Sequence, residues 1–380
     1  RDIERAKRTF FDKAIGETVV QSKQVPVLIN YSVGKKRYEK KPDELDLKLI
    51  KKIDEMDIPY WFPKDRMPEG DEARRNDRIG ITHVHHFYTK RNLYVLACLK
   101  DNIVKYKKGN FLLLLFNSHL INLSKLNRHR IGVSFPYNPL SGTLYISSMV
   151  NESNVLIAYK NKVKKLLKIN NRRKNYEVIT TTQSNNNISN IYTDSVDYIF
   201  TDPPFGSNLM YSELNFIWEA WLKIFTNNRS EAIINKVQRK GLKEYQVLME
   251  ECFSENYRIL KPGRWMTVEF HNSNNSVWNS IQEAILRAGF VIANVKKIDK
   301  QQGSFNQVTT TSAVKQDLII SAYKPKSSFV GRFLKEAGTE EGVWDFTRQH
   351  LSKLPVIVEN NDKLDIIPER ENFLLYDSMV

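Results

Sequence analysis

Cysteine is nearly absent from this 380-residue chain, which contains only Cys98 and Cys252. Two cysteines far apart in the sequence exclude a disulfide framework and a cysteine-rich zinc site, and they fit a reducing, cytoplasmic setting. Long apolar runs are also missing, since the longest, at 111–116, is far shorter than the roughly 20 residues that span a bilayer. The first residues contain no apolar segment typical of a signal peptide. We therefore expect a cytoplasmic protein with no membrane partner.

Acidic residues are fewer than basic ones, 43 against 58, which gives a net charge of +15. A surplus of this size favours a polyanionic partner such as nucleic acid, although charge alone does not separate DNA from RNA or anionic lipid. Hydrophobic residues make up 41% of the chain and aromatic residues 11%, so a real core can form and wholesale disorder is excluded. The length fits one large domain or two ordinary ones.

The first half of the chain is charged and mixed, and then largely helical. Hydrophobic periodicity and turn residues predict a strand at 25–33, a helix at 43–54, a proline-rich loop at 58–71, a helical region at 87–130 and a further helix within 151–175. We expect an N-terminal mixed segment at 1–85 and a helical connecting or DNA-recognition segment at 86–175.

The second half alternates between strand and helix, which is typical of an open α/β sheet. The pattern predicts strands at 176–181, 196–200, 264–270, 290–298 and 316–323, and helices at 211–225, 242–260 and 276–288. The strand 196–200 is almost continuously apolar, so we expect a buried, central, parallel strand. We expect the α/β domain to span 176–325 and a C-terminal tail to occupy 326–380, with a helix near 342–354.

The most informative short segment is Thr201-Asp-Pro-Pro-Phe-Gly206, which directly follows the predicted strand 196–200. Ligands of open α/β sheets bind outside the carboxyl ends of the strands, so a turn with polar and aromatic residues is expected to form a site here. A stiff turn that only ends a strand is the alternative for so short a string. The apolar strand before it and the aromatic residue and glycine within it favour a site.

These residue types fit methyl transfer to an exocyclic amine. The lone pair of an aromatic amine is delocalised into the ring, which makes the nitrogen a poor nucleophile. The carboxylate of Asp202 and the carbonyl of Pro203 can accept its two N–H bonds and draw the nitrogen toward tetrahedral geometry. Consecutive prolines hold the carbonyl direction. The ring of Phe205 offers a surface for a base that has left its stack, a contact typically worth ~1–3 kcal/mol.

The segment 201–206 resembles the motif of the amino methyltransferases, which modify adenine N6 or cytosine N4 in DNA. The surrounding sequence is similar to the adenine-specific DNA methylase family, whose longer members carry a zinc ribbon. The resemblance spans about 25–325 and is specific at 194–222. It is carried by the segments 83–93, 141–146, 194–208, 211–215, 260–266 and 302–305.

The resemblance implies a Rossmann-like methyltransferase sheet, mostly parallel with an antiparallel strand pair at its end. It implies S-adenosylmethionine as cofactor and DNA as partner. Carried over by position, the catalytic residues that bind the amine and stack the base are Asp202, Pro203, Pro204 and Phe205.

The same resemblance makes Gly206, Asn208 and Tyr211 substrate-binding residues that shape the base pocket. The aspartate of the motif favours adenine N6, since serine at this place is associated with cytosine N4. Two alternatives stay open: methylation of RNA amino groups, and a non-catalytic remnant that binds nucleic acid.

The sequence departs from the family where the cofactor should bind. Such enzymes hold S-adenosylmethionine with a loop of the Asp/Glu-x-Phe-x-Gly-x-Gly kind, and the nearest apolar candidate, 109–118, has no second glycine. The cofactor-binding residues are therefore unidentified. The cysteine pairs of the zinc ribbon are missing too. In the family these parts lie upstream, and the chain lacks an initiator methionine, so we expect an incomplete sheet in a chain truncated at its N-terminus.

Other residues are weaker candidates. His83, His85 and His86 are adjacent, but the sequence shows no carboxylate or cysteine that completes a metal site, so we expect no metal. Glu269 and His271, at the end of the strand 264–270, either line the site or form a strand-end pair.

Two further groups need structural context. On the helix that follows the motif, Trp218 and Trp221 are expected in the core. The basic runs at 35–37, 162–168 and 172–174 contact phosphates or are solvated surface.

Overall fold

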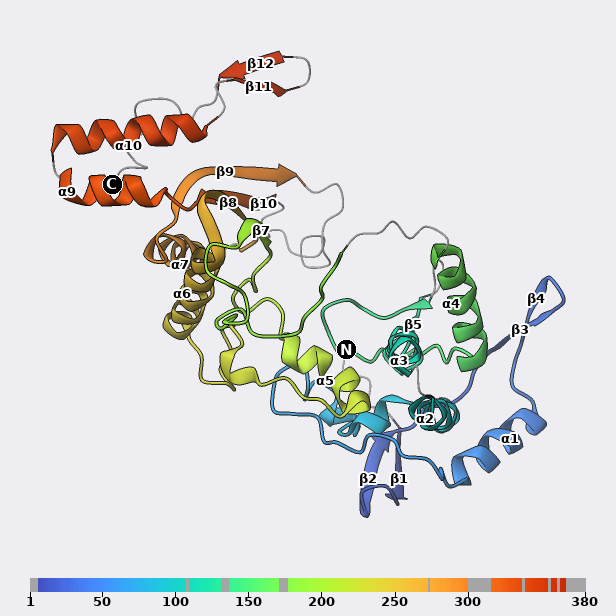
Figure 1. The fold of residues 1–380 in the computed structure, drawn as a ribbon. Coiled ribbons are helices and arrows are strands. Elements are labelled where there is room, and N and C mark those ends of the chain that lie inside the picture. The colour runs from blue at the N-terminus through green and yellow to red at the C-terminus, as the bar shows by residue number, and fades with distance from the viewer. Residues whose placement is uncertain are drawn as a thin grey trace. The chain divides into compact units, whose positions relative to one another are not determined.

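The computed structural model describes residues 6–106, 109–130, 137–170, 177–272, 274–299, 316–336, 339–354, 357–360 and 363–366. The chain divides into two compact units, shown in Figure 1. Unit 1 contains residues 1–178 and 210–226, and unit 2 contains residues 179–209 and 227–380. The helix after the motif therefore belongs to a different unit from the motif itself. The predicted domain boundaries near 85, 175 and 325 stay predictions.

Unit 1 consists of small antiparallel hairpins and helices. Its paired strands are β1 (Lys7–Asp12) with β2 (Glu17–Ser22), β3 (Ile29–Val33) with β4 (Lys36–Lys40), and β5 (Arg128–His129) with β6 (Tyr137–Asn138). Its helices are α1 (Glu44–Glu55), η1 (Asp77–Ile79), η2 (Val84–Phe87), α2 (Lys90–Val104), α3 (Gly109–Asn117), α4 (Val155–Asn170) and α5 (Tyr211–Leu222). The predicted helix at 43–54 is confirmed as α1, which begins after the N-cap Asp43.

The core of unit 1 is aromatic and centres on Trp221, which is fully buried. The ring of Trp221 makes edge contacts with the rings of Phe116 at 5.3 Å and Tyr88 at 5.9 Å. Its indole N–H donates to the Tyr88 hydroxyl over 3.2 Å, which satisfies the polar atom of a buried ring. The neighbouring Trp218 donates to the carbonyl of Asn117 over 3.0 Å. The core role predicted for Trp221 is confirmed, and Trp218 is partly buried and packs against the same core.

Unit 2 contains a mixed four-stranded sheet in the order β7-β8-β10-β9. Its elements are β7 (Val196–Thr201), η3 (Asn228–Ser230), α6 (Leu242–Ile259), β8 (Leu260–Phe270), α7 (Asn275–Arg287), β9 (Val291–Asp299), β10 (Gln316–Tyr323), α9 (Ser327–Glu336), α10 (Glu340–Lys353), β11 (Ile357–Asn360) and β12 (Lys363–Ile366). The pair β7–β8 is parallel, and β8–β10 and β10–β9 are antiparallel. The α/β class and the antiparallel strands at the end of the sheet are confirmed. The expectation of a mostly parallel sheet is corrected for the described strands, since one of their three pairs is parallel.

Helices α6 and α7 pack on this sheet through apolar side chains that repeat at helical spacing. Tyr245, Met249 and Phe253 of α6 are buried together with Ile281 and Ile285 of α7. The amphipathic pattern that predicted both helices is thus the pattern that covers the sheet.

Three expectations about this region are corrected. Residues 177–181 form no strand, and residue 176 lies outside the described part of the chain. The strand β7 is at an edge of the sheet rather than at its centre, because among the described strands it pairs with β8 alone. Its apolar sequence predicted a buried strand, but the side chains of Tyr198 and Phe200 are 55% and 58% exposed. The C-terminal segment contains the predicted helix as α10, and α9 before it was missed.

None of the helices in the described ranges has the length and apolar character needed to cross a bilayer.

Candidate active site

The motif segment forms a loop at the carboxyl end of β7, as predicted. Thr201 ends the strand, and residues 202–206, called the motif loop below, follow it. The parallel register pairs Thr201 with Val268 of β8, so the motif loop leaves the sheet at the same edge as residues 269–272. Ligands of α/β sheets bind at this edge. Because β7 is an edge strand, the described residues form only the β8 side of the crevice.

The prolines of the motif loop are held in place by helix α6. Pro203 is buried, and the carbonyl of Pro204 accepts a hydrogen bond from the Tyr245 hydroxyl over 2.6 Å. The same carbonyl accepts the backbone N–H of Gly206 over 3.1 Å. Burial raises the pKa of the Tyr245 hydroxyl well above its usual range, so this group stays protonated and donates at neutral pH. Fixed proline φ angles and this bond leave the loop little freedom.

The ring of Phe205 is half-buried and held edge-on by aromatic neighbours. Its centroid lies 5.3 Å from that of Phe270, the last residue of β8, and 6.1 Å from the ring of His271. The carbonyl of Phe205 accepts the side-chain amide of Asn272 over 3.0 Å. The ring therefore has a defined orientation and keeps part of its surface accessible, as a stacking platform requires.

Gly206 ends the loop in a conformation that other residues rarely adopt. Its φ is +68°, and a Cβ atom here would lie 3.3 Å from Val277 Cγ1 and 3.4 Å from both Asn272 Nδ2 and Ile234 Cδ1. Its carbonyl accepts the backbone N–H of Ile234 over 3.2 Å. Glycine is therefore required by the local backbone and packing, and its assignment as a substrate-binding residue stays a prediction.

Asp202 is the exposed residue of the motif loop, between the half-buried Thr201 and the buried Pro203. An exposed carboxylate on a rigid loop can accept hydrogen bonds from the N–H groups of a ligand without any rearrangement of buried side chains. Asn208 is also exposed and belongs to unit 2 with the motif loop. Tyr211 begins α5 in unit 1, so its predicted part in the base pocket stays a prediction.

The two polar residues expected at the end of β8 have different environments. His271 Nδ1 lies 3.0 Å from Oδ1 of Asp317, a residue of β10 that is 1% exposed. Glu269 is half-buried and pairs in register with Ile319 of β10. His271 pairs with Asp317 and adjoins the motif loop through Phe205, and a part for Glu269 or His271 in the site stays a prediction.

Sequence reasoning missed Tyr245, Asn272 and Asp317, which lie around the motif loop or behind His271. Tyr245 is 41 residues from Pro204 in the sequence, and Asn272 is 67 residues from Phe205. No local spacing signals such contacts, because they arise from strand register and helix packing.

The histidines of η2 do have a carboxylate partner, contrary to the sequence-based expectation. Oδ2 of Asp12 lies 2.8 Å from Nε2 of both His85 and His86, and all three residues are buried. Nitrogen and carboxylate ligands so close together fit a cation in principle. However, Nδ1 of His86 accepts the backbone N–H of Thr82 over 3.2 Å, so the proton of a neutral His86 must be on Nε2, where a metal would need the lone pair. The geometry therefore favours a hydrogen-bonded carboxylate, and absence of a metal stays a prediction.

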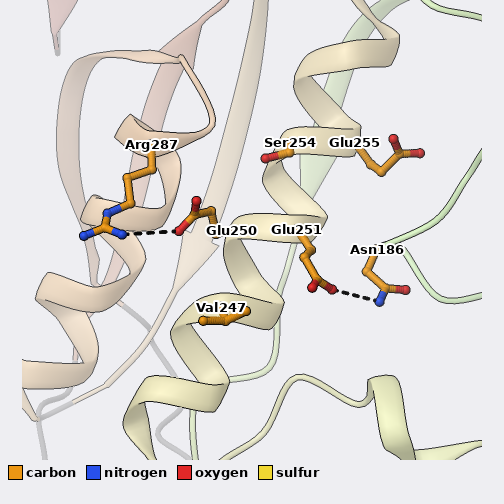
Figure 2. Close-up of a pocket in the computed structure, with 7 residues that line it drawn as sticks. All are labelled: Asn186, Val247, Glu250, Glu251, Ser254, Glu255 and Arg287. Atoms are coloured by element: carbon orange, nitrogen blue, oxygen red, sulfur yellow. Dashed lines mark hydrogen bonds and ion pairs between the residues drawn. The ribbon is translucent and has the colours of Figure 1, made fainter.

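The helix α6 also borders a shallow groove of about 540 Å³, shown in Figure 2. Its lining includes the carboxylates Glu250, Glu251 and Glu255, and Glu250 pairs with Arg287 at 3.8 Å. These residues are on the solvent face of α6, whereas Tyr245 reaches the motif loop from the buried face. The groove is thus separate from the motif loop, and its carboxylates would repel a phosphate.

The cofactor does not fit the described residues. The segment 109–118, the nearest apolar candidate for the glycine-rich loop, folds as helix α3 and not as a strand followed by a loop. Tyr198 and Phe200 of the edge strand β7 are exposed, so the described elements do not cover the face of the sheet that carries these two side chains. The chain therefore presents the motif loop without a pocket for S-adenosylmethionine in the described ranges.

The comparison with protein families finds a match for the part of the chain that contains the motif loop. Residues 196–366 match the model of the DNA methylase family N6_N4_Mtase. No curated protein matches the chain.

Among solved structures, the chain is similar to a Thermus thermophilus protein described as a DNA modification methylase, at 14% identity over 42% of this chain and 60% of that one, with a TM-score of 0.22. It is also similar to an S-adenosylmethionine-dependent methyltransferase of Methanosarcina mazei, at 10% identity over 43% and 77%, with a TM-score of 0.24. The cyclase SpnF matches at 12% identity over 46% and 65%, with a TM-score of 0.22. All three TM-scores are below 0.5, so these similarities carry no argument, and the family model covers less than half of the chain.

Proposed function

We propose that this chain carries the target-base half of an S-adenosylmethionine-dependent DNA amino methyltransferase that acts on adenine N6. The observation that carries the proposal is the motif loop, which stands at the carboxyl end of β7 within the segment that matches the DNA methylase family. The net charge of +15 supports a nucleic-acid partner.

In this proposal the motif loop orients the amine of an extruded base. The carboxylate of Asp202 and the carbonyl of Pro203 accept the two N–H bonds of the amine, and the nitrogen lone pair then points away from the loop. The bond from Tyr245 to Pro204 keeps the loop in one conformation, so no reorganisation is needed when the base arrives. The base stacks on the accessible part of the Phe205 ring.

The aspartate at the head of the motif loop is the support for adenine over cytosine. The cofactor would be bound by protein outside the described residues, because these provide neither its glycine-rich loop nor a second strand beside β7.

The test is methyl transfer measured on two proteins: residues 1–380, and the longest reading frame that contains them. Each is incubated with deuterated S-adenosylmethionine and with duplex DNA or tRNA, and the nucleosides are analysed by mass spectrometry. We expect N6-methyl-2′-deoxyadenosine from the longer protein and little or none from residues 1–380. Labelled cytosine alone would overturn the adenine assignment, labelled tRNA alone would overturn DNA as substrate, and no product at all would overturn the enzyme.

A further inference from the structure

The hairpin of β3 and β4 is largely exposed, and the side-chain amide of Asn30 in β3 donates to the hydroxyl of Tyr137 over 3.3 Å. Among residues 29–40, called the basic ribbon below, none is buried, and Tyr31, Tyr38 and Val33 are 43%, 41% and 63% exposed. An isolated two-stranded hairpin is at best marginally stable in water. The register that aligns the basic ribbon is nevertheless regular, from Ile29 opposite Lys40 to Val33 opposite Lys36.

Positive charge is concentrated on and beside the basic ribbon. Residues 23–41 carry six basic side chains and one acidic side chain, so this short segment holds one third of the chain's net charge of +15. Lys40 forms ion pairs with Asp43 and Asp46. For the three basic residues at the tip, Lys35, Lys36 and Arg37, no described residue provides a counter-charge. The tip is therefore a set of cations free to meet an external anion.

The two faces of the basic ribbon differ in chemistry. Tyr31 and Tyr38 are directly opposite each other, and their rings stack with centroids 5.5 Å apart. Since side chains alternate along a strand, Lys36 and Val33 share the face of the tyrosines, whereas Arg37 and Ser32 occupy the other face. One face thus pairs aromatic rings with a lysine. The other presents Arg37 and Ser32 near the tip, with Glu39 and Asn30 farther from it.

We propose that the basic ribbon enters the major groove of duplex DNA. This inference rests on the proposed function for the identity of the partner, and it names the element that holds the DNA. The major groove is about 12 Å wide and admits a two-stranded ribbon. Lys35 and Lys36 contact phosphates on the groove walls, while Arg37 and Ser32 face base edges.

The shape of the partner follows from the same geometry. Duplex RNA has a deep and narrow major groove that side chains cannot enter, so it would lose the contacts of the ribbon faces. A ribbon five residues long on each side spans roughly 17 Å, which is enough to follow the groove across several base pairs.

The test measures binding of residues 1–380 to a labelled duplex of about 25 base pairs by fluorescence anisotropy between about 50 and 300 mM salt, without any cofactor. The variant Lys35→Gln, Lys36→Gln, Arg37→Gln should reduce the slope of log K against log salt by about 2–3 and weaken binding at least tenfold at about 50 mM salt. The control variant Lys48→Gln, Lys51→Gln, Lys52→Gln removes the same charge from helix α1 and should change the slope by less than about 1. Thermal unfolding by circular dichroism checks that both variants fold.

Equal effects of the two variants would overturn the proposal, because the charge would then act diffusely. A second measurement identifies the groove: methyl green, a major-groove ligand, should displace the protein, and netropsin, a minor-groove ligand, should not. Displacement by netropsin alone, or duplex RNA bound as tightly as DNA with the same loss in the tip variant, would also overturn it. Because this experiment measures DNA binding and not methyl transfer, its result can be interpreted even if the catalytic proposal fails.

Discussion

The hydroxyl of Tyr245 donates a 2.6 Å hydrogen bond to the carbonyl of Pro204, so the solvent-facing motif loop is fixed by a side chain from the buried face of helix α6. The loop and the helix are neighbours only in the folded chain. A rigid loop of this kind is what amine orientation requires, because misplaced acceptors lose most of their effect on the reacting nitrogen.

Tyr245→Phe should therefore loosen the loop and leave the fold intact. We expect a loss of about 1 kcal/mol in the free energy of unfolding, the usual value of one hydrogen bond. The rate of methyl transfer by the protein that the longest reading frame encodes should fall on the order of tenfold. Tyr257→Phe, on the same helix, is the control and should leave the rate unchanged. Equal rates for both variants would mean that the bond does not serve the site.

Gly206→Ala should destabilise the protein more than Gly16→Ala, a substitution at a glycine with a similar φ but open surroundings. Gly206 and Gly16 have φ of +68° and +73°, but a Cβ at Gly16 meets nothing within 4 Å. The left-handed conformation costs an alanine roughly 1–2 kcal/mol at either place. We expect the Gly206 variant to lose clearly more in urea unfolding, because Val277, Asn272 and Ile234 must also move. Equal losses would show that the loop packs more loosely than described.

Asp12→Asn should be strongly destabilising. Burial acts to raise the pKa of the Asp12 carboxyl, but hydrogen bonds from His85 and His86 outweigh it and hold this pKa far below its usual range. The amide has one acceptor oxygen and no charge, so we expect a loss of about 2–3 kcal/mol in the free energy of unfolding.

The matched control for Asp12 is Asp57→Asn, which breaks an exposed ion pair with Lys13 and should cost less than about 1 kcal/mol. Metal content of both proteins is measured by mass spectrometry. A stoichiometric metal in the wild-type protein that Asp12→Asn removes would contradict the hydrogen-bonded arrangement and show a metal centre.

Stability should fall as the pH drops below neutrality. Burial is the main cause that lowers the pKa of four histidines, His83, His86, His119 and His350. Between the unfolded value of about 6.5 and these lower folded values, the unfolded chain binds more protons than the folded one, so acid favours unfolding. The urea midpoint at pH 5.5 should lie below that at pH 7.5 at constant ionic strength. A higher midpoint at pH 5.5 would show that protonation stabilises these sites.

Local patterns predicted helices such as α1 and α6, and the motif loop, because their signals are local. The capping residue Asp43, the amphipathic repeat of α6 and the prolines after β7 all act within a few residues of their position. The apolar run of β7 correctly indicated a strand. It did not indicate the edge position, because the same run fits a buried strand and a strand whose neighbour is not among the described residues.

The long-range contacts, both at the motif loop and in unit 1, could not be predicted from the sequence. Asp12 meets His85 across 73 residues, and Tyr245 meets Pro204 across 41. Lys125 shows the same limit. Nothing in its sequence neighbourhood marks it as buried, yet it is buried, and burial lowers its pKa to about 8. Long-range packing decides such cases, and a single sequence carries no local sign of it.

The most direct test of the central claim replaces Asp202 in the longer reading frame. If its carboxylate orients the target amine, Asp202→Asn should reduce methyl transfer to adenine by about 10²–10³-fold, because the amide keeps the shape and loses the charge. Asp197→Asn, which changes an exposed aspartate on β7, is the control and should keep full activity. Binding to duplex DNA should stay within about twofold for both. Full methyl transfer by the Asp202→Asn protein would contradict the account, since the motif loop would then not act on the amine.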